Sequence, residues 1–162
     1  MKTIDRHRYR NGKSIFQTRS LKFNPYPMTE IESVMGLILD NLSPDLLKGR
    51  KTLNYPEDIL TNKYYGHCYH SSQVLHFIMD TDILYPMSAY DYREEKHWWL
   101  SDGETNYDVT QDQYYSVGET PPYLKGKKTA WYGWKQRPQQ VSMNLLVKTL
   151  GDRLISDEII NY

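Results

Sequence analysis

The sequence predicts an α+β fold, in which helices pack against a small antiparallel sheet. Two helical segments come first, three short aromatic or β-branched strands follow, and a further helix lies near the end of the chain. Helices and strands that occur in separate blocks are typical of α+β folds. A chain of 162 residues without internal repeats has the length of one domain with a single core.

Apolar residues at helical spacing predict three helices. The first runs from Glu30 to Leu42, and Thr29 and Glu32 form a capping box at its start. The second runs from Cys68 to Asp80, after a glycine that breaks the chain. The third begins near Pro138, a residue that suits a first helical turn.

Three short segments rich in aromatic or β-branched residues predict strands. They are Met87–Tyr92, Lys96–Leu100 and Glu104–Val109. Asp102 and Gly103 lie between the last two and are typical of a hairpin turn. We expect a helical turn over residues 110–115 and a loop with one strand over residues 116–136.

The net charge is zero, with 20 Lys and Arg against 20 Asp and Glu, but the charges are unevenly distributed. Residues 1–22 hold seven Lys or Arg against Asp5 alone, a net charge of +6, so the remaining residues carry −6. We therefore expect a basic N-terminal arm, residues 1–22, and one domain, residues 23–162. Such an arm is either a solvated, poorly ordered terminus or a contact for phosphate or an acidic partner. Nucleic acid is not favoured as the partner, because the arm lacks a dense basic run.

The chain has one cysteine, Cys68. A single cysteine excludes an intramolecular disulfide, and zinc fingers in their usual forms need at least two thiolates. No window approaches the roughly 20 apolar residues of a membrane span, and the first residues have no apolar stretch of the signal-peptide kind. We therefore expect a cytoplasmic protein that does not engage membranes.

Cys68 lies at the predicted start of a helix, in the segment Tyr64-Tyr65-Gly66-His67-Cys68-Tyr69-His70-Ser71-Ser72. The amino end of a helix favours an anion, and therefore the thiolate form that makes cysteine a nucleophile. A catalytic cysteine also needs an imidazole that takes its proton and a polar group that orients this imidazole. The alternative is that Cys68 is a small buried hydrophobe, and its polar neighbours in the sequence weigh against this.

The predicted hairpin supplies both of these groups. A turn centred on Asp102 and Gly103 places His97 directly opposite Asp108, and the Cβ atoms of such cross-strand partners are about 4.5–5.5 Å apart. The carboxylate can therefore reach the ring. A solvent-facing His–Asp pair satisfies the same register, so the register alone leaves both interpretations open.

Three pieces of the sequence resemble the papain-like cysteine hydrolase superfamily in its compact bacterial and phage forms. These forms include transglutaminase-like enzymes, cell-wall peptidases and YunG-like uncharacterised proteins. The matching pieces are Gly66-His67-Cys68, then His97-Trp98-Trp99-Leu100 with Asp102-Gly103, and Asp108-Val109-Thr110-Gln111-Asp112-Gln113-Tyr114. The resemblance covers about residues 62–150, and its hairpin part is the more specific.

The resemblance implies a papain-like core, in which a nucleophile helix packs on a small antiparallel sheet with flanking helices. It implies a catalytic triad with Cys68 as nucleophile, His97 as base and Asp108 as orienting residue. The implied reaction is attack on an amide or peptide bond, followed by hydrolysis or acyl transfer. The substrate stays open among proteins, peptides and small amides.

The resemblance also suggests residues around the triad. Papain-like enzymes often place an amide side chain before the cysteine as an oxyanion donor, and Asn62 is the nearby candidate in place of the usual glutamine. The Cys68 backbone amide is the alternative donor. Four aromatic residues either line a substrate cleft or pack in the core, namely Tyr65, Tyr69, Trp98 and Trp99.

His67, Cys68, His70 and His76 suggest a metal site, because imidazole and thiolate are zinc ligands. On one helix, His67 and His70 could share a face, but Cys68 is turned by about 100° from His67. We therefore expect no metal and no cofactor, and we place His70 and His76 at the helix surface or its boundary. A zinc ion held by Cys68, His97 and Asp108 is the remaining metal alternative.

A second class of function also stays open. The chain could be a non-enzymatic, phage-type binding or inhibitor protein that uses a papain-like scaffold to engage a host protein or nucleic acid. The basic arm or the Tyr- and Trp-rich segment 123–134 would then form the contact. The presence of all three triad residue types favours the enzyme. If the protein is phage-encoded, we expect it in the host cytoplasm.

Overall fold

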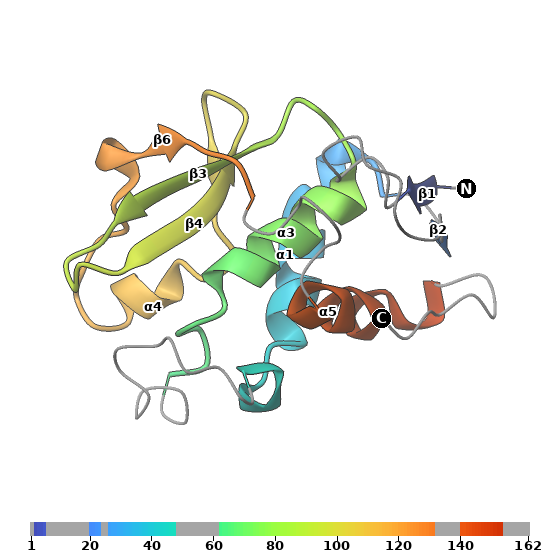
Figure 1. Ribbon diagram of the computed structural model, residues 1–162, viewed down its shortest axis with the longest axis horizontal. Helices are drawn as coiled ribbons and strands as arrows, with labels where there is room; N and C mark the ends of the chain where they lie inside the picture. The colour runs from blue at the N-terminus through green and yellow to red at the C-terminus, as the bar shows by residue number, and fades with distance from the viewer. Residues whose placement is uncertain (1, 6–19, 24–25, 48–61, 132–139, 154–162) are drawn as a thin grey trace.

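The computed structural model describes residues 2–5, 20–23, 26–47, 62–131 and 140–153. Within these ranges the fold is α+β, as the sequence predicts: a four-stranded antiparallel sheet lies beside a group of helices (Figure 1). None of the helices in these ranges combines the length and the apolar character that a bilayer span requires.

The predicted helices are confirmed where the structure describes them. The α-helices are α1 (Ile31–Asp40), α3 (Cys68–Met79), α4 (Asp112–Tyr115) and α5 (Gln140–Leu150), and the 3₁₀ turns are η2 (Met28–Glu30), η3 (Pro44–Leu47), η4 (Tyr123–Lys125) and η5 (Gly151–Arg153). The predicted capping box is wrong, because Thr29 lies inside η2 and no side chain caps either η2 or α1. Pro27 is extended, and its carbonyl accepts a hydrogen bond from Glu30 N at 2.9 Å, so the chain turns before α1 begins. Pro138 lies outside the described residues.

The larger sheet has the strand order β5-β4-β3-β6, and all of its pairs are antiparallel. Its strands are β3 (Tyr85–Tyr90), β4 (Lys96–Ser101), β5 (Asn106–Tyr107) and β6 (Lys127–Lys128). A separate hairpin pairs β1 (Lys2–Asp5) with β2 (Ser20–Phe23), which the sequence did not predict. The predicted arm therefore includes β1 and most of β2, and the rest of it lies outside the described residues.

The hairpin between β4 and β5 has a longer turn than predicted. Leu100 pairs with Tyr107, so the predicted direct pairing of His97 with Asp108 is wrong. If the observed register continued, Trp99 would lie opposite Asp108, but the strand pairing ends before that point. The reason is Asp102, whose Oδ1 accepts hydrogen bonds from the backbone N–H groups of the two residues after Gly103, at 2.9 and 2.7 Å. A shift of two residues leaves every side chain on its predicted face.

Helix α3 is the central helix of the fold, and it contacts β4, α1 and α5 (Figure 1). It runs along β4: Cys68 Sγ lies 3.9 Å from the Lys96 carbonyl oxygen, and Ser72 Oγ lies 3.2 Å from that of Trp98. Four helical residues advance about 6 Å and two strand residues about 6.8 Å, so the two elements stay side by side. Cys68 is thereby held beside the first residues of β4.

The packing around α3 differs from the prediction at one histidine. His70 is completely buried, so its predicted place at the helix surface is wrong. The reason is that α3 is covered on nearly all sides, and every residue from Tyr69 to Leu75 is buried. His76, near the other end of the helix, is partly exposed, as predicted.

Strand β4 separates two environments. Leu100 belongs to the hydrophobic core, together with apolar side chains of α1, α3 and α5. On the opposite face, the rings of His97 and Trp99 contact Tyr114 of α4 and Tyr123 of η4, respectively. One face of β4 is therefore part of the core, and the other carries the polar candidate site.

Candidate active site

Cys68 is the first residue of α3 and is partly exposed. The turn before it requires Gly66, whose φ of +83° lies in the left-handed region that favours glycine. This turn ends the loop and starts the helix at the cysteine, so the sulfur lies at a helix amino end that favours an anion.

His97 is the second residue of β4 and is 1 % exposed. Its partner in β3 is Ala89, whose small side chain leaves space on this face for an imidazole. Trp99 stacks on the ring with a centroid distance of 5.7 Å, and Tyr114 meets it edge-on at 4.8 Å. The ring is therefore held by packing on two sides.

Asp108 follows β5 directly, and its carboxylate is buried against the His97 ring. Oδ2 lies 2.6 Å from Nε2 of His97 and accepts a second hydrogen bond from the Tyr123 hydroxyl at 2.9 Å. Oδ1 accepts one from the backbone N–H of Thr110 at 3.1 Å. Both carboxylate oxygens thus have donors, which a buried charge requires.

The pKa of His97 reflects these surroundings. Burial acts to lower it, but the charge of Asp108 and its hydrogen bond act in the opposite direction, and Cys68 adds to them. Together they raise the pKa of His97 from 6.5 to about 10. The ring is therefore an imidazolium at neutral pH.

Cys68 is the third group of this arrangement. Its thiol is close enough to His97 to contribute to the raised pKa of the ring. Because Asp108 occupies Nε2, the ring nitrogen that remains for the sulfur is Nδ1. The structure thus brings together the three predicted triad residues, although not by the predicted strand register.

Asn62 lies in the loop ahead of α3. Its Oδ1 accepts a hydrogen bond from the backbone N–H of Tyr64 at 3.0 Å, and its carbonyl accepts one from Tyr65 N at 3.3 Å. These bonds form the turn that leads to Gly66. The role of Asn62 as an oxyanion donor stays a prediction.

The four aromatic residues predicted near the site are all buried, with exposed fractions of 4 % or less. Tyr69 and Trp98 meet edge-on at 4.8 Å, on the core side of β4. Tyr65 instead donates its hydroxyl to the Glu95 carboxylate at 2.9 Å. Packing is the role that the structure gives to these residues, and lining of a substrate cleft stays a prediction.

Three further residues of the site were not predicted to contact the triad residues: Thr110, Tyr114 and Tyr123. Thr110 lies two positions after Asp108, a spacing typical of an Asx turn, so a local signal for it exists. Gln113 Nε2 donates to Thr110 Oγ1 at 3.0 Å, which continues this chain of hydrogen bonds into α4. Tyr123 comes from a distant loop, and no sequence pattern indicates its contact with Asp108.

Burial and the charge of Asp108 raise the pKa of Tyr123, so its hydroxyl stays protonated and donates to the carboxylate. Burial and the Asp91 carboxylate likewise raise the pKa of Tyr114, whose hydroxyl donates to Asp91 at 2.7 Å. Tyr123 thus supports the carboxylate, and Tyr114 supports the imidazole.

The described part of the aromatic segment 123–134 contacts its own domain. Tyr123 bonds to Asp108, and Trp131 stacks on Trp98 with a centroid distance of 5.7 Å. Leu124 between them is fully exposed. Recognition of a partner by this segment stays a prediction.

The two histidines next to Cys68 contact each other. Nδ1 of His67 and Nε2 of His70 lie 2.7 Å apart, and both rings are buried. Within the described ranges, no group of three or more His, Cys, Asp or Glu side chains is arranged to hold a metal ion.

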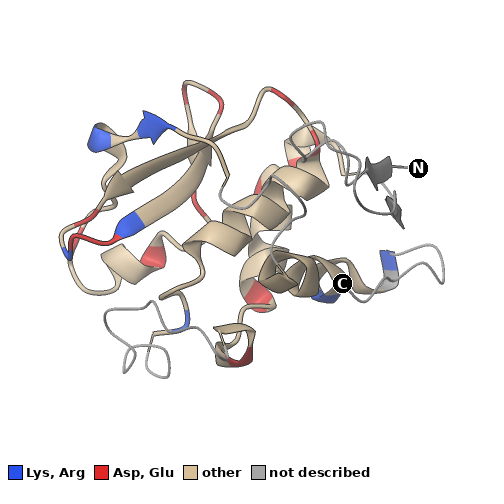
Figure 2. Ribbon diagram, in the orientation of Figure 1, with Lys and Arg blue, Asp and Glu red and all other residues tan. Residues whose placement is uncertain are grey.

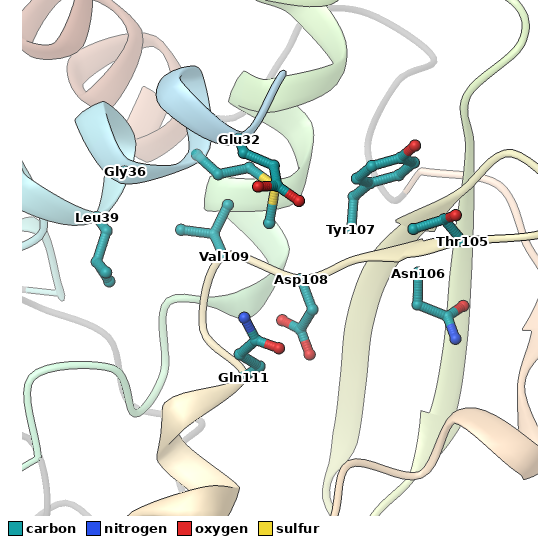
Figure 3. A pocket seen from close by; sticks show the side chains of 10 residues that line it. Glu32, Gly36, Leu39, Thr105, Asn106, Tyr107, Asp108, Val109 and Gln111 are labelled. Atoms are coloured by element: carbon teal, nitrogen blue, oxygen red, sulfur yellow. The ribbon is translucent and has the colours of Figure 1, made fainter. Parts of the chain in front are cut away.

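A cavity of about 350 Å³ lies between α1 and the segment that carries Asp108 (Figure 3). Glu32 of α1 and Gln111 line it, together with Asp108 itself. Cys68 and His97 are not among its lining residues, so the cavity adjoins the carboxylate end of the triad and not the thiol.

Comparison with known proteins gives no match for this chain: no protein-family model, no curated protein and no solved structure matches it.

Proposed function

We propose that this protein is a cysteine-dependent hydrolase or acyl transferase of the papain-like type, which acts on an amide or peptide bond. One observation carries the proposal: a buried imidazole contacts a carboxylate at 2.6 Å, and the thiol of the only cysteine is close enough to raise the pKa of this ring. Nucleophile, proton carrier and orienting group are the parts that thiol catalysis needs.

The proposed resting state is an ion pair. At neutral pH the His97 ring carries a proton, because its pKa is about 10. The positive ring beside Cys68 and the amino end of α3 both favour the thiolate. Asp108 and Tyr123 hold the Nε2 side of the ring, so Nδ1–H is directed to the sulfur.

In the proposed first step, the thiolate attacks the carbonyl carbon of the amide and forms a C–S bond. When the C–N bond breaks, Nδ1 of His97 transfers its proton to the leaving nitrogen, and a thioester with neutral His97 remains. In the second step, water or another acceptor gives a proton to His97 and attacks the thioester. The C–S bond then breaks, which restores the thiolate and the imidazolium.

The negative oxygen of the tetrahedral intermediate needs hydrogen-bond donors. The backbone N–H of Cys68 is the donor we favour, since it is one of the N–H groups at the start of α3 without a helical partner. The side-chain amide of Asn62 is the second candidate. Its Oδ1 accepts a hydrogen bond from Tyr64 N, and its NH₂ group is the donor that could serve the oxyanion.

The arrangement of the elements also supports a papain-like core. The helix that begins with the cysteine packs on an antiparallel sheet, the histidine lies near the start of a strand, and the carboxylate follows the next strand. This order of residues is the one that the sequence resemblance implies.

Alkylation of the thiol tests the proposal. Because the chain has one cysteine, iodoacetamide gives one adduct per molecule, and mass spectrometry follows its formation. At pH 6.5 we expect Cys68 to react about tenfold faster than a short peptide with the same local sequence, because the ion pair supplies thiolate. His97→Gln removes the proton carrier and should abolish this advantage.

His76→Gln is the matched control, since His76 lies on the same helix but does not belong to the triad. It should alkylate like the wild type. A second measurement tests acyl transfer: p-nitrophenyl acetate should form a thioester on Cys68 that hydroxylamine removes. Alkylation at the rate of an ordinary thiol, unaffected by His97→Gln in a folded protein, would overturn the proposal.

A further inference from the structure

A groove of about 610 Å³ lies between the β3–β4 hairpin and the segment that joins η4 to β6. Its walls carry four lysines against one aspartate and one glutamate, namely Lys96, Lys125, Lys127 and Lys128 against Asp91 and Glu94. Figure 2 shows these lysines as blue segments on η4, on β6 and at the start of β4. We call this feature the lysine groove.

The lysine groove carries more positive than negative charge. Asp91 is engaged in its own turn: Oδ1 accepts hydrogen bonds from Arg93 N at 2.8 Å and Glu95 N at 3.0 Å, and Oδ2 accepts one from Tyr114. Within the described part of the chain, Lys125 and Lys127 form no ion pair. Their positive charge is therefore available to an anionic ligand.

The groove also contains an open part of a sheet edge. Strand β6 pairs only with Met87 and Ser88 of β3, and Thr129 N donates to the Pro86 carbonyl at 3.1 Å. Backbone groups alternate between the two edges of a strand, so those of Tyr90 point to the same edge as those of Pro86. Since β6 does not reach Tyr90, this edge can accept the backbone of another extended chain.

Lys96 connects the groove with the triad. Its side chain lines the groove, and its backbone oxygen lies 3.9 Å from Cys68 Sγ. A chain bound in the groove would therefore lie next to the strand that carries His97. This places the groove where a substrate of the proposed enzyme would extend beyond the bond that is attacked.

We infer that the lysine groove binds an acidic polypeptide segment, with its backbone along the open edge at Tyr90 and its carboxylates near Lys125 and Lys127. A polypeptide fits these observations better than a nucleic acid, because an open strand edge pairs with a peptide backbone. The inference rests on the proposed function in one respect only, namely that this polypeptide is the substrate.

The test measures binding with the full-length Cys68→Ala protein, so that no reaction takes place. The probe is a short fluorescein-labelled peptide in which every second residue is glutamate, and the control peptide has glutamine in the same places. We expect fluorescence anisotropy to show binding of the glutamate peptide only, weakened when salt is raised from about 0.02 M to about 0.3 M.

Two double variants with the same net charge locate the site. Lys125→Ala with Lys127→Ala should weaken binding about fivefold, because two exposed contacts to carboxylates are lost. Lys63→Ala with Lys148→Ala removes two exposed lysines outside the groove and should leave binding unchanged. If both double variants weaken binding equally, only net charge matters and the inference fails.

Two further results would overturn the inference: equal binding of the glutamine peptide, or tighter binding of a single-stranded oligonucleotide of the same length. The proposed function is tested separately, because alkylation of Cys68 does not depend on the groove. If alkylation is fast but the peptide does not bind, only the inference about the lysine groove fails. If the peptide binds but the thiol reacts at an ordinary rate, only the proposed function fails.

Discussion

Trp98 and Trp99 are neighbours in β4 and are both buried, but they lie in different environments. Trp98 packs edge-on against Tyr69 of α3 at 4.8 Å and stacks on Trp131. Trp99 stacks on His97, and its Nε1 donates to Asn106 Oδ1 at 2.9 Å. The same residue type therefore packs in the core on one face of the strand and against the candidate site on the other.

Burial therefore has two consequences in this domain. On the core face, burial removes apolar surface from water and stabilises the fold. On the site face, it removes water from a charged pair, which strengthens the attraction between His97 and Asp108. Four substitutions or conditions test whether the two faces differ in this way.

The largest effect should come from Asp108→Asn. Without the carboxylate, burial becomes the main influence and the pKa of His97 falls below 6.5. We expect the alkylation advantage of Cys68 at pH 6.5 to disappear and turnover of an amide substrate to fall by about 10²–10⁴. Asp112→Asn, an exposed change on α4, is the control and should leave both unchanged. Wild-type alkylation by a folded Asp108→Asn protein would contradict the triad.

The second test replaces each of the two tryptophans by leucine. Trp98→Leu and Trp99→Leu should each lower the free energy of unfolding by about 3 kcal/mol, because each removes a large buried ring. Only Trp99→Leu should also change the rate and the pH dependence of Cys68 alkylation, because it releases the His97 ring. Urea unfolding and alkylation measure the two effects. If both variants alter alkylation equally, the two faces are not functionally distinct.

The third test is the pH dependence of stability. The pKa of His97 is raised from 6.5 to about 10 in the folded protein, so its contribution is complete below pH 6.5 and is lost as pH rises toward 10. The free energy of unfolding should fall by up to about 5 kcal/mol over this range in the wild type. The decrease should be smaller in His97→Gln. Urea unfolding at a series of pH values measures it, and equal slopes in the two proteins would exclude the proposed ion pair.

The smallest effect should come from Tyr123→Phe, which removes the hydroxyl that donates to Asp108 at 2.9 Å. A hydrogen bond contributes about 1 kcal/mol, so alkylation at pH 6.5 should slow by about fivefold. Tyr115→Phe is the control, because Tyr115 is half exposed and lies on α4. Equal rates in the two variants would show that Tyr123 does not position the carboxylate.

Local patterns were sufficient for much of the fold. The start of α3 near Cys68 and the start of a strand at Lys96 were predicted, because a glycine turn and aromatic alternation act locally. Strands β1 and β2 were not predicted, because such short segments give no local signal for their pairing, whereas β6 lies within residues 116–136, where one strand was expected. The burial of His70 likewise depends on elements that cover α3 from other parts of the chain.

The contact between His97 and Asp108 was predicted, but the strand register that produces it was not. The His97–Asp108 contact is present, but the side chain of Asp102 lengthens the turn and shifts the strand register by two residues. The side chains nevertheless lie on the predicted face of the sheet, because side chains alternate along a strand with a period of two. Tyr123 could not be predicted, since its contact with Asp108 depends on the path of a loop without a regular pattern.

The parallel course of α3 and β4 has a consequence for insertions and deletions. Cys68 and Ser72 contact carbonyl groups two residues apart in β4, so each turn of the helix stays next to a fixed pair of strand residues. One residue inserted between Cys68 and Ser72 rotates the thiol by about 100° around the helix, away from His97. Residues inserted at the exposed turn after Asp102 leave this alignment unchanged. The length of the first turn of α3 is therefore fixed by the need to keep the thiol beside His97.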